Sequence, residues 1–144
     1  MKSSLEAAVR RRARDACEYC RIPQAAYRLS FQLDHVIAKQ HGGKTQVANL
    51  ALACPRCNRN KGPNIASIDI SIRSLVPLFN PRRDRWSDHF RWRGARLLAL
   101  TPTGRVTIRL LAINHPDSVA LRRLLILDGS FPPDNRADAQ AGSN

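Results

Sequence analysis

The pattern of apolar and polar positions divides the first half of the chain into a helix, two strands and a second helix. Residues 4–15 consist mainly of Ala, Leu and Arg, which favour helices. Residues 29–37 alternate in part between apolar and polar side chains and predict a strand, and residues 49–53 form a second, shorter apolar strand. Residues 55–61 predict a helix, because a proline stands at the first turn and Gly-Pro follows the last one.

The second half has weaker periodicity and is rich in arginine. Residues 67–79 predict a helix, and residues 80–93 predict an irregular segment that carries arginines and aromatic side chains. Two apolar runs, 95–101 and 105–113, flank a Pro-Thr-Gly turn and predict a hairpin. Residues 117–127 predict a final helix that ends before a glycine.

Charge narrows the class of partner. The 144 residues include 24 Lys and Arg against 11 Asp and Glu, which gives a formal net charge of +13. Such an excess indicates a polyanionic partner. Only four of the basic residues are lysines, and the arginine fork suits phosphate oxygens. Charge alone leaves open a basic protein that binds nucleic acid without sequence preference.

The cellular setting follows from two further features of the sequence. No apolar stretch approaches the ~20 residues of a membrane-spanning helix. The first residues are charged and lack the apolar run of a signal peptide. We therefore expect a cytosolic protein without a membrane partner, whose cysteines are reduced and available to bind metal.

The four cysteines form two C-x-x-C pairs, Cys17 with Cys20 and Cys54 with Cys57. A two-residue spacer lets both thiolates of a pair point at the same ion, so the two pairs together predict a tetrahedral zinc site. Four thiolates leave no position for water, and the predicted role of the zinc is therefore structural. A redox pair or unrelated buried thiols are the alternatives.

Between the two pairs lie residues with catalytic potential. His35 is a natural general base because an imidazole titrates near neutral pH. On a regular strand its neighbour Asp34 would project to the opposite face, so convergence of the two side chains requires a bulge or a bend. Taken singly, His35 could be a structural strand histidine, and Asn49, which opens the second strand, could be a simple turn residue.

The whole run C-x-x-C, L-D-H-V-I, G-G, N-L, C-x-x-C-N-x-x-K-G resembles the HNH endonuclease family, whose core is the ββα-metal fold. The resemblance covers residues 17–62. It implies that Asp34 and Asn58 bind a catalytic divalent ion, Mg²⁺ or Mn²⁺, and that Asn49 orients the general base His35. The sequence departs from the family name at the third position, where Asn58 replaces a histidine and an amide oxygen would serve as the ligand.

Four further residues near this motif are candidates for binding the nucleic-acid backbone. Arg59 and Lys61 follow Asn58 on the predicted helix, and His41 and Lys44 lie in the loop between the strands. Basic side chains at these places could contact the phosphates that flank the scissile bond. For His41 a simple solvated loop position is the alternative.

The aromatic residues of the second half have two possible roles. Trp86, Phe90 and Trp92 could stack on bases, but packing onto the core is the reading that we favour. The arginines between them would then extend the track for DNA. No catalytic role is predicted for this segment, and His89 is a remote candidate for any site.

The sequence thus predicts an α+β fold in which an HNH ββα-metal core, residues 1–66, is stabilised by a four-cysteine zinc knuckle. Residues 67–129 form an extension with a hairpin and a helix, and residues 130–144 form a disordered tail. The predicted function is endonucleolytic hydrolysis of DNA, most naturally double-stranded DNA. The alternatives are a zinc-knuckle module that binds nucleic acid without cleaving it, and a nuclease that acts on RNA.

Overall fold

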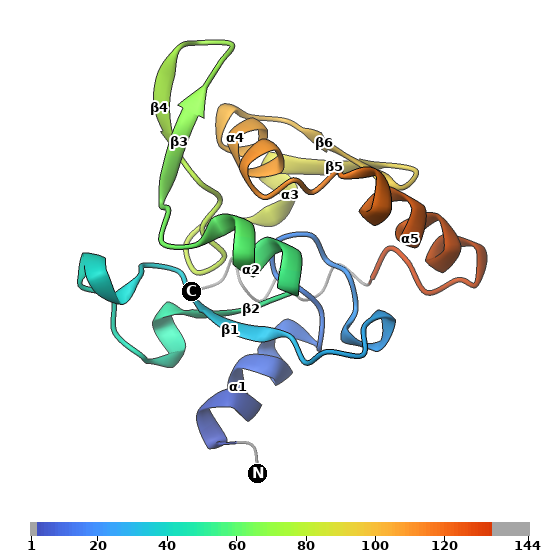
Figure 1. Ribbon diagram of the computed structural model, residues 1–144, viewed down its shortest axis with the longest axis horizontal. Helices are drawn as coiled ribbons and strands as arrows, with labels where there is room; N and C mark the ends of the chain where they lie inside the picture. Colours follow the sequence, from blue (N-terminus) through green and yellow to red (C-terminus); the bar gives the residue numbers. More distant parts are fainter. Residues whose placement is uncertain (1–2, 134–144) are drawn as a thin grey trace.

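The computed structural model describes residues 3–133 and has an α+β architecture, as predicted (Figure 1). Short antiparallel strand pairs alternate with helices along the chain. The helices are α1 (Ser4–Ala13), α2 (Pro55–Lys61), α3 (Trp86–His89), α4 (Pro102–Leu110) and α5 (Pro116–Leu127). The strands are β1 (Gln32–His35), β2 (Leu50–Ala53), β3 (Ala66–Asp69), β4 (Ser74–Pro77), β5 (Phe90–Arg93) and β6 (Arg96–Ala99). Single 3₁₀ turns lie at Gln24–Ala26, Lys39–His41 and Val47–Asn49.

The predicted order of strand, loop, strand and helix is confirmed in β1, β2 and α2. β1 and β2 pair in an antiparallel register that sets Asp34 opposite Ala51 and His35 opposite Leu50. All four residues of β2 are buried, because α1 covers one side of the strand pair and α2 the other (Figure 1). This packing holds the end of β1 against α2 and so brings the candidate catalytic residues onto one surface.

α1 is attached to the ββα unit by its arginines. Arg10 is buried and donates to the Phe31 carbonyl at 2.8 Å, and Arg12 donates to the Val47 carbonyl at 2.9 Å and to that of Leu50. Guanidinium groups in these positions satisfy carbonyls at the ends of the strand pair. Part of the basic cluster at the start of the chain therefore stabilises the fold.

The helix predicted over residues 67–79 is wrong, because the segment forms the β3–β4 hairpin. In its register Ile68 lies opposite Leu75 on the outer face, and the turn between the strands carries Ile70 and Ile72. Isoleucine at every second position is a strand pattern, and branching at Cβ disfavours the helix. Figure 1 shows this hairpin projecting from the body of the molecule.

The predicted hairpin of the extension exists, but it lies earlier in the chain than expected. β5 and β6 pair around the turn at Gly94, and the second expected strand, 105–113, lies mostly in α4. The Pro-Thr-Gly segment is the start of this helix: the Thr101 hydroxyl accepts from the Gly104 N–H at 3.0 Å, and Pro102 occupies the first turn. A threonine cap followed by proline is a helix-start signal. The predicted last helix is confirmed as α5.

One hydrophobic core joins the ββα unit to the extension. Trp86, Phe90, Leu97 and Leu111 of the extension are buried in the same cluster as the strands of the ββα unit. The aromatic side chains therefore pack inward, as predicted. Among the described residues, no helix is long and apolar enough to span a membrane.

The predicted disordered tail falls largely outside the described residues, which end at residue 133. Its first part is packed: Phe131 is buried, and its ring lies edge-on to Trp92 at a centroid distance of 4.9 Å. The chain is therefore ordered beyond the predicted boundary at residue 130.

Candidate functional site

The two cysteine pairs meet in one buried cluster. The four sulfur atoms of Cys17, Cys20, Cys54 and Cys57 lie within 4.8 Å of one another, and the Cys20 and Cys54 sulfurs are 3.8 Å apart. A tetrahedral ion with zinc–sulfur bonds of about 2.3 Å would separate its sulfurs by roughly 3.8 Å. The cluster is thus placed to hold a metal ion.

The electrostatics of the cluster also favour a cation. Hydrogen bonding among the sulfurs, first with Cys17, raises the pKa of the Cys20 and Cys57 thiols far above its ordinary value and lowers the pKa of Cys54. Cys54 caps α2, and its sulfur accepts from the Cys57 N–H at 3.5 Å. Without a cation only part of the cluster can ionise, because four thiolates in contact repel one another. A divalent ion among the sulfurs would offset much of that repulsion.

A buried arginine from the extension lies beside the cluster. Arg122 of α5 is 1 % exposed and donates to the carbonyls of Ala95 at 2.8 Å and Ile113 at 3.0 Å. Burial lowers the pKa of Arg122, and the nearby Cys20 and Cys57 sulfurs act in the opposite direction. Because four thiolates around a divalent ion carry a net negative charge, this guanidinium complements the cluster as well as bonding the backbone.

We expect Arg122→Ala to lower the free energy of unfolding by about 3 kcal/mol, since it leaves buried carbonyls without a donor and removes a cation beside the sulfurs. Arg123→Ala, at the exposed neighbouring position, is the matched control and should change stability by less than about 0.5 kcal/mol. Urea unfolding of both variants, followed by circular dichroism, makes the comparison. Equal midpoints would contradict the role of Arg122.

The candidate catalytic residues come together in a second place. Asp34, His35 and Asn58 line one open hollow of about 290 Å³ between the end of β1 and α2. His35 is the last residue of β1, and Asn58 lies in the middle of α2. All three residues border the same open space, even though neighbouring side chains on a regular strand project to opposite faces.

The Asp34 carboxylate is held from two sides. It accepts from the Tyr19 hydroxyl at 2.7 Å and from the Lys61 ammonium at 3.1 Å. Burial raises the pKa of Asp34, whereas the charge of Lys61 and the Tyr19 hydroxyl act to lower it. Sequence reasoning missed Tyr19, whose only signal is its place between the ligands of the first cysteine pair.

The prediction that Lys61 contacts backbone phosphates does not fit the structure, because Lys61 is buried. Its side chain is 2 % exposed, and its ammonium also donates to the carbonyls of His35 at 3.1 Å and Val36 at 3.2 Å. With one carboxylate and two backbone carbonyls already around it, this ammonium acts inside the protein. It ties α2 to the end of β1 and fixes the Asp34 carboxylate.

His35 is half-buried and has one side-chain partner. Its Nε2 atom lies 2.8 Å from the Thr45 hydroxyl, which belongs to the loop between β1 and β2. Sequence reasoning also missed Thr45, because a loop threonine carries no signal of its own. The contact restricts rotation of the imidazole and leaves its other nitrogen, Nδ1, for a different partner.

Asn49 clamps the same loop. Its amide oxygen accepts from the Ile37 N–H, and its amide nitrogen donates to the Ile37 and Lys44 carbonyls, each at 2.9 Å. A side chain on Gly43 would collide with the Ile37 carbonyl at 1.7 Å, so this close approach requires glycine. Asn49 thereby fixes the chain immediately after His35.

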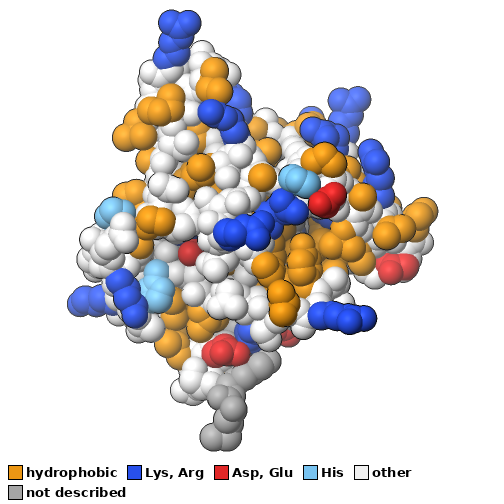
Figure 2. All heavy atoms as spheres, in the orientation of Figure 1, with side chains coloured by type: hydrophobic (Ala, Val, Ile, Leu, Met, Phe, Trp, Pro, Cys, Tyr) orange, Lys and Arg blue, Asp and Glu red, His pale blue; other side chains and the backbone are white. Residues whose placement is uncertain are grey.

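The other basic candidates lie on the surface. Arg59 of α2 and His41 and Lys44 of the loop are exposed. Figure 2 shows Lys and Arg side chains scattered over many parts of one face, with few acidic side chains among them. This distribution suits a broad contact with a polyanion.

The first cysteine knuckle also contacts the extension. The Trp86 indole donates to the Tyr19 carbonyl at 2.9 Å, and Arg82 forms a buried ion pair with Glu18. Tyr19 therefore contacts Asp34 through its hydroxyl and the extension through its backbone. The cysteine cluster, the hollow beside β1 and α2, and the extension are therefore connected through this knuckle.

Fold and site together define an α+β protein with a ββα core. A cluster of four cysteines placed to bind a metal ion joins the segment before β1 to the start of α2. Comparison with protein families matches residues 17–64 to the family described as HNH endonuclease. This segment, a third of the 144 residues, matches the HNH endonuclease family, as the sequence motifs predicted. Neither the curated proteins nor the solved structures contain a match to the chain.

Proposed function

We propose that this protein is an endonuclease that hydrolyses phosphodiester bonds of double-stranded DNA. The observation that carries the proposal is that Asp34, His35 and Asn58 line one open hollow within the HNH segment. An imidazole beside two oxygen ligands is the set that metal-assisted hydrolysis needs. The net charge of +13 supports a polyanionic substrate.

His35 is the general base in this proposal. In the tautomer that donates Nε2–H to Thr45, its Nδ1 atom is free to accept the proton of the attacking water. The water oxygen bonds to phosphorus as the bond from phosphorus to the 3′ oxygen breaks. Thr45 holds the ring in place, and Asn49 fixes the following backbone through Ile37.

Asp34 and Asn58 would hold one divalent ion, Mg²⁺ or Mn²⁺. A carboxylate and an amide oxygen, completed by waters and a phosphate oxygen, form the all-oxygen ligand set that these ions prefer. Such an ion supplies positive charge that stabilises the crowded phosphorus centre and the leaving oxygen. Tyr19 and Lys61 hold the Asp34 carboxylate in a fixed orientation.

The four-cysteine cluster is proposed to bind structural zinc, with no part in the chemistry. Four thiolates fill a tetrahedral shell, so no position is left for water or substrate. In the proposed cytosolic setting the four cysteines stay reduced and can bind the zinc.

Arg59, Lys44 and His41 are proposed to contact backbone phosphates beside the hollow.

The direct test is incubation of the zinc-loaded protein with supercoiled plasmid, linear duplex and RNA, each with Mg²⁺, with Mn²⁺ or without either ion. We expect divalent-ion-dependent cleavage of the DNA substrates. Salt-sensitive DNA binding without cleavage in either ion would instead indicate a binding module. Cleavage restricted to RNA would overturn the substrate assignment.

Tyr19→Phe tests the positioning of the proposed ion. Loss of the hydroxyl frees one side of the Asp34 carboxylate, and we expect a roughly tenfold higher Mg²⁺ concentration for half-maximal cleavage. Tyr27→Phe, which removes a half-buried hydroxyl outside this contact, is the matched control. A lower maximal rate in Tyr19→Phe with an unchanged Mg²⁺ dependence would contradict a positioning role.

A further inference from the structure

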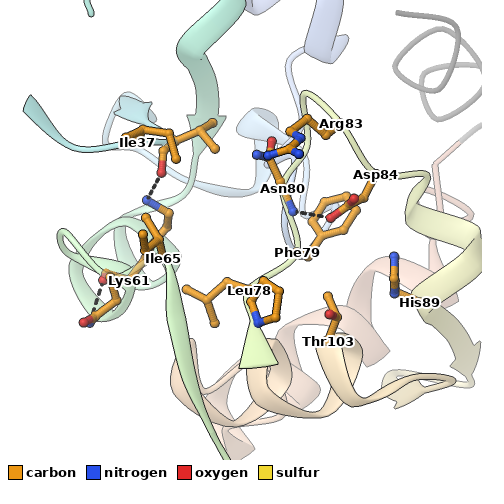
Figure 3. A pocket seen from close by; sticks show the side chains of 13 residues that line it. Ile37, Lys61, Ile65, Leu78, Phe79, Asn80, Arg83, Asp84, His89 and Thr103 are labelled. Carbon is orange, nitrogen blue, oxygen red and sulfur yellow. Dashed lines mark hydrogen bonds between the residues drawn. The ribbon is translucent and has the colours of Figure 1, made fainter. Parts of the chain in front are cut away.

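A second cavity lies next to the proposed catalytic hollow, where the ββα unit meets the extension (Figure 3). Its volume is about 320 Å³. Ile37, Lys61 and Asn64 form one side of this cavity, and their neighbours in the chain, Ala38 and Pro63, line the hollow. The two spaces therefore share a wall made of the turn after β1 and the turn after α2. The proposed catalytic roles do not use this cavity.

The lining combines apolar and polar groups. Ile65, Leu78 and Phe79 supply apolar surface, and Asp84 and His89 supply hydrogen-bonding groups. Figure 3 shows Ile65 on one side of the space, with Asp84 and His89 on the other. An ion or a free phosphate would gain nothing from the apolar walls. A flat heterocycle, with apolar faces and a polar edge, can use both kinds of surface.

The polar side chains are held by the fold. The Asp84 carboxylate accepts from the Asn80 N–H at 2.9 Å, and His89 Nδ1 lies 2.6 Å from the hydroxyl of Thr101, the residue that caps α4. The His89 ring also packs against Phe79 at a centroid distance of 6.0 Å. Groups fixed before binding lose little freedom when a ligand arrives, so the cavity is preorganised.

Size and charge select the ligand. A pocket of about 320 Å³ admits one nucleobase with its sugar but no base pair. Arg83, exposed at the lining, offers a cation to the phosphate that such a nucleotide carries. Since the cavity shares a wall with the hollow, a strand with its phosphate in the hollow would carry its neighbouring nucleotide close to the cavity.

We infer that the cavity binds a single unstacked nucleobase of the strand that is cut, next to the scissile phosphate. This inference rests on the proposed nuclease function. Taking a base out of the stack costs free energy, and contacts with the pocket offset that cost. Mismatched, nicked or single-stranded positions, where the cost is smallest, are then the preferred places of attack.

The test uses full-length, zinc-loaded protein carrying His35→Ala, so that DNA stays intact. Duplexes with 2-aminopurine at successive positions report unstacking as a rise in fluorescence. We expect a severalfold rise at one position on binding. Ile65→Trp should fill the cavity, abolish this rise and weaken DNA binding about tenfold.

Ile72→Trp, on the β3–β4 turn and outside the cavity, is the control, since Ile72 and Ile65 are 51 % and 45 % exposed. It should keep the fluorescence rise and the affinity. If Ile65→Trp lowers the melting temperature, Asn64→Trp fills the same cavity from an exposed position.

The outcomes separate this inference from the proposed function. A fluorescence rise that Ile65→Trp or Asn64→Trp removes, in a protein whose wild type never cleaves DNA, upholds the cavity and overturns the nuclease proposal. Metal-dependent cleavage with no rise at any position overturns the cavity inference alone. The cavity inference is also overturned if Ile65→Trp, Asn64→Trp and Ile72→Trp show the same fluorescence rise and the same DNA affinity.

Discussion

Removal of zinc with a strong chelator is expected to unfold this protein. Structural zinc contributes roughly 10–16 kcal/mol to the folding of small modules, whereas whole domains are stable by about 5–15 kcal/mol. The cluster lies inside the hydrophobic core, and all four cysteines are buried there. Without the ion the four cysteines no longer stabilise the fold. As thiolates they repel one another, and as thiols they form only weak hydrogen bonds.

The unfolding can be followed by far-ultraviolet circular dichroism and by the fluorescence of Trp86, which is bonded to the knuckle through the Tyr19 carbonyl. Readdition of zinc should restore both signals, and elemental analysis should give one zinc per chain. Cys54→Ser should reproduce the unfolded state without chelator. Chelated protein that keeps the melting temperature of the zinc-loaded form would show that the cluster needs no metal.

His35→Ala is expected to lower the rate of DNA cleavage by about 10²–10⁴-fold, the range that a general base contributes. The substitution removes the proton acceptor and should leave the fold intact, because the side chain is half-buried and, among residues 3–133, its one hydrogen-bond partner is Thr45. Rates of plasmid relaxation in Mg²⁺ measure the effect. DNA affinity, measured in the absence of divalent ions, should change little.

His41→Ala is the matched control, because His41 is an exposed histidine in the loop that follows β1. As a proposed phosphate contact it should lower the rate by less than about tenfold. Equal cleavage rates for wild type and His35→Ala would remove His35 from the mechanism. Equal losses in the two variants would show that imidazole charge, and not base catalysis, is the relevant property.

The sequence predicted the ββα unit well because each of its signals is local. Proline and glycine mark the ends of α2, and each C-x-x-C spacing is a local signal for two thiolates that can share one ion. The family motif also placed Asp34, His35 and Asn58, and the structure brings these three to one hollow. Their catalytic roles stay a prediction.

Features that depend on long-range packing could not be predicted. Lys61 looks like a surface cation in the sequence, yet its ammonium is buried because Asp34 and two backbone carbonyls supply acceptors across the fold. Tyr19 and Thr45 gain their roles only when β1 is placed against them. Two predictions failed for local reasons. Isoleucine at every second position in 68–72 indicates a strand, not the predicted helix. Thr101 followed by Pro102 begins a helix, α4, and is not the turn of a hairpin.

The boundary of the sequence motif differs from the boundary of the stable structure. The HNH match ends at residue 64, but the hydrophobic core continues through Trp86 to Ile113, and Trp86 holds the loop that orients Asp34. An engineer who transplants the HNH segment into another protein must therefore include the downstream residues. The segment alone would lack the packing that holds Tyr19, and through it Asp34, in place.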